Sequence, residues 1–139
     1  MARAAQDVVG ARFRLHGRDA ATGLDCVGVV AVATGEAVPT GYALRGGDAV
    51  RICGMLDARL ARGDGRCAGD VLLFAVGAGQ LHLAIASAGG IVHADAGLGR
   101  VVERSGVAPW VLLGAWRTTA ERTGAGRTEA GRGDIRWRR

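Results

Sequence analysis

The second half of the chain constrains the fold most, because its apolar residues come in short runs separated by Gly or Pro. The runs are VLLFAV (71–76), LHLAIA (81–86), IVHA (91–94), GRVVER (99–104) and WVLLGAW (110–116). Runs of this length between turn-forming residues are typical of β-strands. The pattern predicts five consecutive antiparallel strands, which is a β-meander.

The first half has a different period, which indicates helices. Apolar residues recur with helical spacing in 3–13 and 48–62. Between them, CVGVVAVAT (26–34) follows Asp25, a good N-cap residue, and ends before Gly35. The Gly-containing segments 14–23, 36–47 and 63–70 are expected to be connections. Helices followed by a meander predict an α+β fold in which N-terminal helices pack on an antiparallel sheet.

Length and composition favour one soluble domain. The chain has 139 residues, enough for one core, and its hydrophobic content of 49% includes only 4% aromatic residues. No run approaches the ~20 apolar residues of a membrane span, and residues 1–25 carry charges throughout, unlike an export signal. A cytoplasmic location as synthesised is therefore expected. The three cysteines are odd in number and form no CxxC pair, so free thiols are expected.

The last 22 residues differ from the rest. Residues 118–139 carry six Arg and three acidic residues, a net charge of +3, whereas 1–117 carry 12 Arg and 10 acidic residues, a net charge of +2. The segment has no apolar period, so we expect a domain over 1–117 and a disordered, basic tail over 118–139. Trp137 lies among arginines, which leaves a nucleic-acid or cell-wall affinity open. All 18 basic residues are Arg, which indicates compositional bias, so nucleic acid is not an expected partner.

Cys26 is the candidate nucleophile because it begins a predicted helix. Unpaired N–H groups and the positive end of the helix dipole favour the thiolate, the reactive form of cysteine. The carboxylate of Asp25 opposes this effect. The helix start alone therefore does not activate the thiol, and a histidine partner is needed.

His82 and His93 are the candidate partners, since each lies in a short apolar strand. A turn centred on Ser87 and Ala88 would pair residues whose numbers sum to 175. His82 would then lie directly opposite His93 on the same face, with Cβ atoms ~5 Å apart. Cys26, His82 and His93 would form a nucleophile, a general base and a residue that orients the base. A zinc site that adds Asp95 or water as a fourth ligand is the alternative.

These residues occur in an order that resembles the NlpC family of cell-wall cysteine peptidases. The resemblance rests on GLDCVGVV, GDVLLFAV, LHLAIA and IVHA, and it covers roughly 3–117. It implies a papain-like fold, with Cys26 as the nucleophile, His82 as the general base and His93 as the residue that orients His82. Gly69 and Asp70 match the turn before a strand. The ending PWVLLGAWR looks most like the phage-type branch, which prophages and gene-transfer-agent clusters carry.

The resemblance implies hydrolysis of an amide bond in peptidoglycan stem peptides, between D-glutamate and a diamino acid, without metal or organic cofactor. Phage-tail-like proteins are implied as partners. Two positions depart from the family pattern: Val27 replaces the usual Ser, and Phe13 stands near the place of a Tyr whose hydroxyl assists the oxyanion site. An amidase or acyltransferase with the same fold remains an alternative, as does a non-catalytic tail-assembly or wall-binding module.

Overall fold

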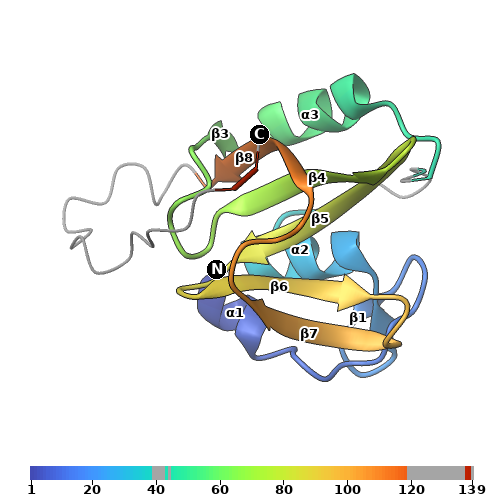
Figure 1. Cartoon of the computed structure of the whole chain (residues 1–139). Coiled ribbons are helices and arrows are strands. Elements are labelled where there is room, and N and C mark those ends of the chain that lie inside the picture. Colours follow the sequence, from blue (N-terminus) through green and yellow to red (C-terminus); the bar gives the residue numbers. More distant parts are fainter. Residues whose placement is uncertain (39–42, 44, 119–136, 139) are drawn as a thin grey trace.

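The computed structural model describes residues 1–38, 43, 45–118 and 137–138. Figure 1 shows a curled sheet accompanied by short helices. The helices are α1 (Ala2–Gln6), α2 (Cys26–Thr34) and α3 (Ala49–Asp57). The strands are β1 (Arg18–Asp19), β2 (Gly23–Leu24), β3 (Ala61–Arg62), β4 (Val71–Gly77), β5 (Gln80–Ala86), β6 (Gly90–Asp95), β7 (Arg100–Ser105) and β8 (Val111–Arg117). The predicted α+β class is confirmed.

The main sheet is antiparallel with strand order β3-β8-β4-β5-β6-β7. The meander prediction is confirmed from β4 to β7, but it is wrong for β8, which crosses back to pair with β4 (Figure 1). The burial of β4 and β7, the two possible partners of β8, explains this pairing. The first four side chains of β4 are fully buried on both faces, so β4 is a central strand with a partner on each edge. Most of β7 is exposed, which suits an edge strand.

The hairpin between β5 and β6 has a different register from the predicted one. Ile85 lies opposite Val92 and Ala86 opposite Ile91, so paired numbers sum to 177. The backbone N–H of Ser87 donates to the carbonyl oxygen of Gly90 at 2.9 Å, which closes a two-residue turn at positions 88 and 89. The prediction that the two histidines are directly opposite is therefore wrong. Relative to the prediction, each residue of β5 is paired with a residue two positions further along β6. Because side chains alternate between faces with a period of two, His82 and His93 remain on the same face.

The helix that starts at Cys26 agrees with the prediction at both ends. The Asp25 carboxylate accepts a hydrogen bond from the backbone N–H of Gly28 at 2.8 Å and caps α2. Gly35 ends the helix in the left-handed conformation, with φ of 71°. These two residues are local signals, which is why the sequence alone locates this helix.

The other two predicted helices are shorter than expected. The helix predicted over 3–13 stops at Gln6, because Gly10 has φ of 93° and the following residues bond to β7, as in the Val101 N–H to Ala11 O bond at 2.8 Å. The helix predicted over 48–62 is Ala49–Asp57, capped by Asp48. Its predicted last turn instead forms β3, which pairs with the end of β8.

Buried apolar side chains cover both faces of the sheet. The larger cluster contains side chains of α2 and α3 together with alternate residues of β4, such as Val71 and Leu73. The smaller cluster lies on the opposite face and includes Leu72, Phe74 and Trp137. The prediction of a solvated tail is thus wrong at Trp137, which is only 8% exposed. The rest of that prediction falls on 119–136 and 139, which lie outside the described residues.

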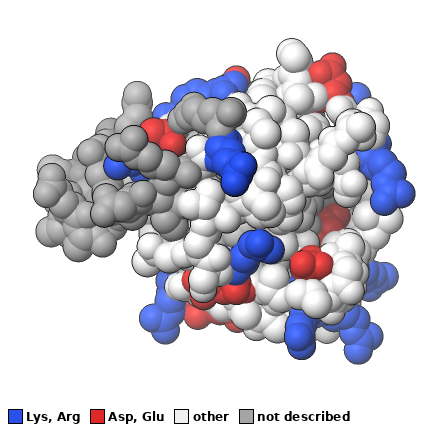
Figure 2. Space-filling model, in the orientation of Figure 1, with Lys and Arg blue, Asp and Glu red and all other residues white. Residues whose placement is uncertain are grey.

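The surface carries its arginines in scattered positions. Figure 2 shows basic and acidic side chains interspersed around one face, whose centre is mostly uncharged. No helix in the described part of the chain combines the length and apolar character that crossing a membrane requires.

Candidate active site

The three candidate residues line one cavity of about 690 Å³. Cys26 reaches it from the start of α2, His82 from β5 and His93 from β6. The other lining residues come from the loop after α1, from the segment before α3, and from the β4–β5 and β6–β7 ends. They are Phe13, Leu15, His16, Asp25, Ala43, Arg45, Val76, Gln80, Leu81, Ala94, Asp95, Ala96 and Trp110.

Asp25 holds the loop before α2 against the helix. Its two carboxylate oxygens accept hydrogen bonds from the backbone N–H of His16, the guanidinium of Arg18 and the backbone N–H of Gly28, each at 2.8 Å. The carboxylate is almost fully buried, so these three donors replace its water shell. Asp25 is therefore committed to holding this loop, and the positive φ of His16 (59°) shows how tightly the loop turns there.

A glycine permits this close approach. A Cβ atom at position 28 would collide with the carbonyl oxygen of Gly17. Gly28 lies on the first turn of α2, two residues after Cys26. The absence of a side chain there lets the loop that carries His16 lie directly on the turn that carries the thiol.

The environment of Cys26 keeps its thiol protonated. Burial raises the pKa of Cys26 to about 12. A hydrogen bond from the backbone of Leu83 lowers this pKa, whereas the negative charge of Asp25 raises it further. The predicted lowering by the helix start is thus outweighed by desolvation. The hydrogen bond from Leu83 also places the sulfur beside β5, at the residue that directly follows His82.

The two histidines form a hydrogen-bonded pair. The Nε2 atom of His82 lies 2.9 Å from the Nδ1 atom of His93, and the rings are nearly perpendicular. This bond uses Nε2 of His82 and leaves its Nδ1 atom for a second partner. The register explains the contact, because the continued pairing puts His93 beside Ala84, diagonal to His82 on the same face.

Both imidazoles are held neutral. Burial, and then the nearby His93, lower the pKa of His82 to about 4, while Asp95 acts in the opposite direction. The pKa of His93 is also lowered, mainly by burial. At neutral pH the site therefore contains a neutral thiol and a neutral base. Such a pair can transfer one proton when the sulfur attacks an electrophile.

Trp110 was not predicted as part of the site. Its ring makes edge contacts with both histidines, at 5.2 Å to His82 and 5.5 Å to His93. The sequence offered one signal, since Trp110 is one of three tryptophans in a chain with few aromatic residues and it follows Pro109 at the start of a strand. His16 is an exposed loop residue that also lines the cavity.

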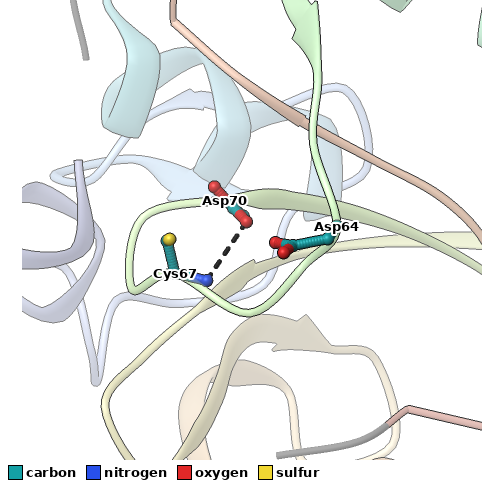
Figure 3. Close-up of side chains that lie close together, drawn as sticks. All are labelled: Asp64, Cys67 and Asp70. Atoms are coloured by element: carbon teal, nitrogen blue, oxygen red, sulfur yellow. Dashed lines mark hydrogen bonds between the residues drawn. The ribbon is translucent and has the colours of Figure 1, made fainter. Parts of the chain in front are cut away.

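A second cluster of potential metal ligands lies elsewhere. Figure 3 shows Asp64, Cys67 and Asp70 gathered in the loop before β4, with ligand atoms all within 4.8 Å of one another. The guanidinium of Arg117 already donates to Asp64 at 3.1 Å and to Asp70 at 2.9 Å. The carboxylates therefore already have a cationic partner.

Cys26, His82 and His93 do not form a comparable cluster. Among the residues that the structure describes, only the Asp64 group has three ligand atoms within this mutual distance. The described residues therefore give no support to the zinc alternative at Cys26, His82 and His93. Comparisons of the sequence with protein-family models and with curated proteins gave no match.

Proposed function

We propose that the protein is a cysteine peptidase that hydrolyses amide bonds in peptidoglycan stem peptides. The observation that carries this proposal is one cavity that is lined by both the thiol at the start of α2 and a hydrogen-bonded pair of histidines. A buried thiol, a base and a group that orients the base are what acyl transfer by a cysteine nucleophile requires.

In the proposed mechanism, His82 accepts the proton of Cys26 as the sulfur attacks the carbonyl carbon. The new C–S bond gives a tetrahedral intermediate, and its collapse breaks the C–N bond while His82 returns the proton to the leaving amine. Water then attacks the thioester, again with His82 as the base, and releases the acid and the free thiol. His93 orients His82 through the 2.9 Å contact.

Stabilisation of the oxyanion would come mainly from the backbone. The N–H of Cys26 lies in the first turn of α2, where backbone N–H groups lack carbonyl partners within the helix. Phe13 lines the same cavity but has no hydroxyl to donate. We therefore expect catalysis to be slower than in a site that has a tyrosine at this place.

The substrate part of the proposal rests on the resemblance to the NlpC family. The order of the Cys26, Gly69-Asp70, His82 and His93 motifs along the chain supports a papain-like fold and a bond between D-glutamate and a diamino acid such as diaminopimelate. The phage-type ending PWVLLGAWR supports delivery to the wall by a phage or gene-transfer particle. No metal or organic cofactor takes part.

A non-catalytic wall-binding module is the second candidate, and one observation favours it. The thiol of Cys26 is only 4% exposed, and its pKa of about 12 leaves almost no thiolate at neutral pH. In that case the cavity would bind stem peptides without cleaving them. The first candidate requires instead that proton transfer to His82 accompanies attack.

Digestion of purified muropeptides, with products identified by mass, tests the proposal. We expect the wild type to release a fragment that ends in D-glutamate, and Cys26→Ala to release none. Binding of the muropeptide without cleavage by either protein would support the wall-binding module. Cleavage of another amide by the wild type would identify an amidase of the same fold, and equal cleavage by both proteins would exclude Cys26 as the nucleophile.

A further inference from the structure

The face of the sheet opposite α2 is closed by a residue from the far end of the chain. Trp137 lies against Phe74 on this face, and in Figure 1 the C-terminal segment lies beside β8. The indole N–H of Trp137 donates to the carbonyl oxygen of Gly65 at 2.6 Å. Its neighbour Arg138 accepts a hydrogen bond from the backbone N–H of Leu112 at 2.6 Å. Two bonds from different elements therefore fix this short segment.

Trp137 is connected to the histidine pair through a series of aromatic contacts. Its ring meets Phe74 at 5.8 Å, and Phe74 meets Trp110 at 5.7 Å, both with edge-on geometry. Trp110 then packs its ring against His82 at 5.2 Å and His93 at 5.5 Å. Phe74 also lies opposite His82 in the pairing of β4 with β5.

Each contact in this series restricts the next ring. Phe74 is fully buried and has aromatic neighbours in both Trp110 and Trp137. Closely packed interiors transmit a change in volume to neighbouring side chains, because few voids can absorb it. Loss of the Trp137 ring would leave space beside Phe74 and would remove the bond to Gly65. The segment would then be held mainly by the bond of Arg138 to Leu112, two residues after Trp110.

We propose that Trp137 is a positioning residue that, through Phe74 and Trp110, holds the His82–His93 pair in place and excludes water from it. The C-terminal segment is then a working part of the active site, although it lies far from the histidines in the sequence. The kinetic consequences rest on the proposed hydrolase function. The packing of the histidines does not, so it can be measured separately.

Titration of the His82 ring by NMR tests the positioning directly. Burial lowers the pKa of His82 to about 4, so Trp137→Ala, by admitting water, should raise the measured value by about one unit or more towards 6.5. Trp137→Phe keeps an aromatic ring and should stay near the wild type. Ile52→Ala, a buried substitution in α3 and the larger cluster, is the control for general loss of stability and should leave the titration unchanged.

The outcomes separate the two proposals. An unchanged His82 titration in folded Trp137→Ala, or an equal shift in Ile52→Ala, would overturn the positioning role. Where Trp137→Ala does not fold, Trp137→Leu keeps apolar volume and must show a shift of the same sign. With muropeptide as substrate, we expect kcat to fall about tenfold in Trp137→Ala with KM unchanged. A wild type that cleaves nothing contradicts the hydrolase proposal alone, because the titration still decides the positioning.

Discussion

Cys26 and Cys67 are equally buried, each 4% exposed, yet their surroundings are opposite in kind. Cys26 lines a cavity with two neutral histidines and lies at a helix start. Cys67 lies in a loop, and its backbone N–H donates to Asp70 at 3.2 Å (Figure 3). Asp70 is also paired with Arg117 at 2.9 Å. The first environment places the thiol in one cavity with neutral imidazoles, whereas the second places the thiol beside carboxylates that are paired with a guanidinium.

The difference teaches that burial alone does not identify a reactive thiol. Desolvation raises the pKa of Cys26, so only a base in contact with the transferred proton makes such a thiol useful. We therefore propose that reaction chemistry takes place in the cavity of Cys26 and that the corner of Cys67 contributes to stability. The following predictions separate these two roles.

The largest expected effect is the loss of hydrolysis in Cys26→Ala. Removing the nucleophile should lower kcat/KM on muropeptides at least about 10³-fold. Cys67→Ala should stay within about twofold, since Cys67 lies outside the cavity lining. Rates are measured by quantifying product mass over time. A Cys67→Ala variant as impaired as Cys26→Ala, while equally folded, would remove the distinction between the two thiols.

The next effect is a dependence of stability on pH from the cavity side. His82 has its pKa lowered from 6.5 to about 4, so the unfolded chain binds more protons between these values. This contribution to stability is complete above pH 6.5 and falls by about 3 kcal/mol as the pH drops to 4. Urea unfolding at several pH values measures it. The slope should be reduced in His82→Gln, and an equal slope in that variant would contradict the burial of a neutral imidazole.

A somewhat smaller effect is expected at the corner of Cys67. Asp70→Asn would leave the buried guanidinium of Arg117 with only the half-exposed Asp64 as its ionic partner. We expect a loss of about 2 kcal/mol in the free energy of unfolding, measured by urea titration at pH 7. The kcat of the folded variant should not change. Asp64→Asn serves as the control and should cost less than about 1 kcal/mol, because its carboxylate is about half exposed to solvent.

The smallest effect is a gain. Phe13→Tyr adds a hydroxyl to a side chain that already lines the cavity. If this hydroxyl donates to the developing oxyanion, kcat should rise a few-fold with little change in KM. Leu15→Tyr, which adds a hydroxyl at another lining position, is the matched control. An equal gain in both variants would show that the position of the donor is unimportant.

Local signals made much of the fold predictable. Asp25 and Gly35 fixed the ends of α2, and the Gly-punctuated runs fixed five strands of the main sheet. The two ends of α2 were predictable because each depends on a residue next to the helix in the sequence. The position of β8 was not predictable in this way, because it depends on which edge of the sheet is buried. The burial of Trp137 was not predictable for a similar reason. The segment around it has the composition of a disordered tail, and its hydrogen-bond partner Gly65 lies 72 residues away.

The sequence predicted which residues line the cavity better than it predicted how they are arranged. The alternation of side chains along the strands correctly placed His82 and His93 on one face. The placement stayed correct although the predicted centre of the hairpin turn was wrong by one position. The contribution of Trp110 depends on the crossover that precedes β8, and no local pattern reports that path. The protonation states were also beyond sequence, because burial rather than the helix start sets the pKa of Cys26.

The most direct measurement compares alkylation of the two buried thiols at pH 6. Trypsin separates the cysteines into peptides 19–45, 52–59 and 67–100, so mass spectrometry can follow Cys26, Cys53 and Cys67 independently after treatment with iodoacetamide. The account predicts that Cys26 reacts at least about tenfold faster than Cys67, and that His82→Ala abolishes this advantage. A Cys26 rate equal to or below that of Cys67 in the folded wild type would contradict the claim that His82 activates it.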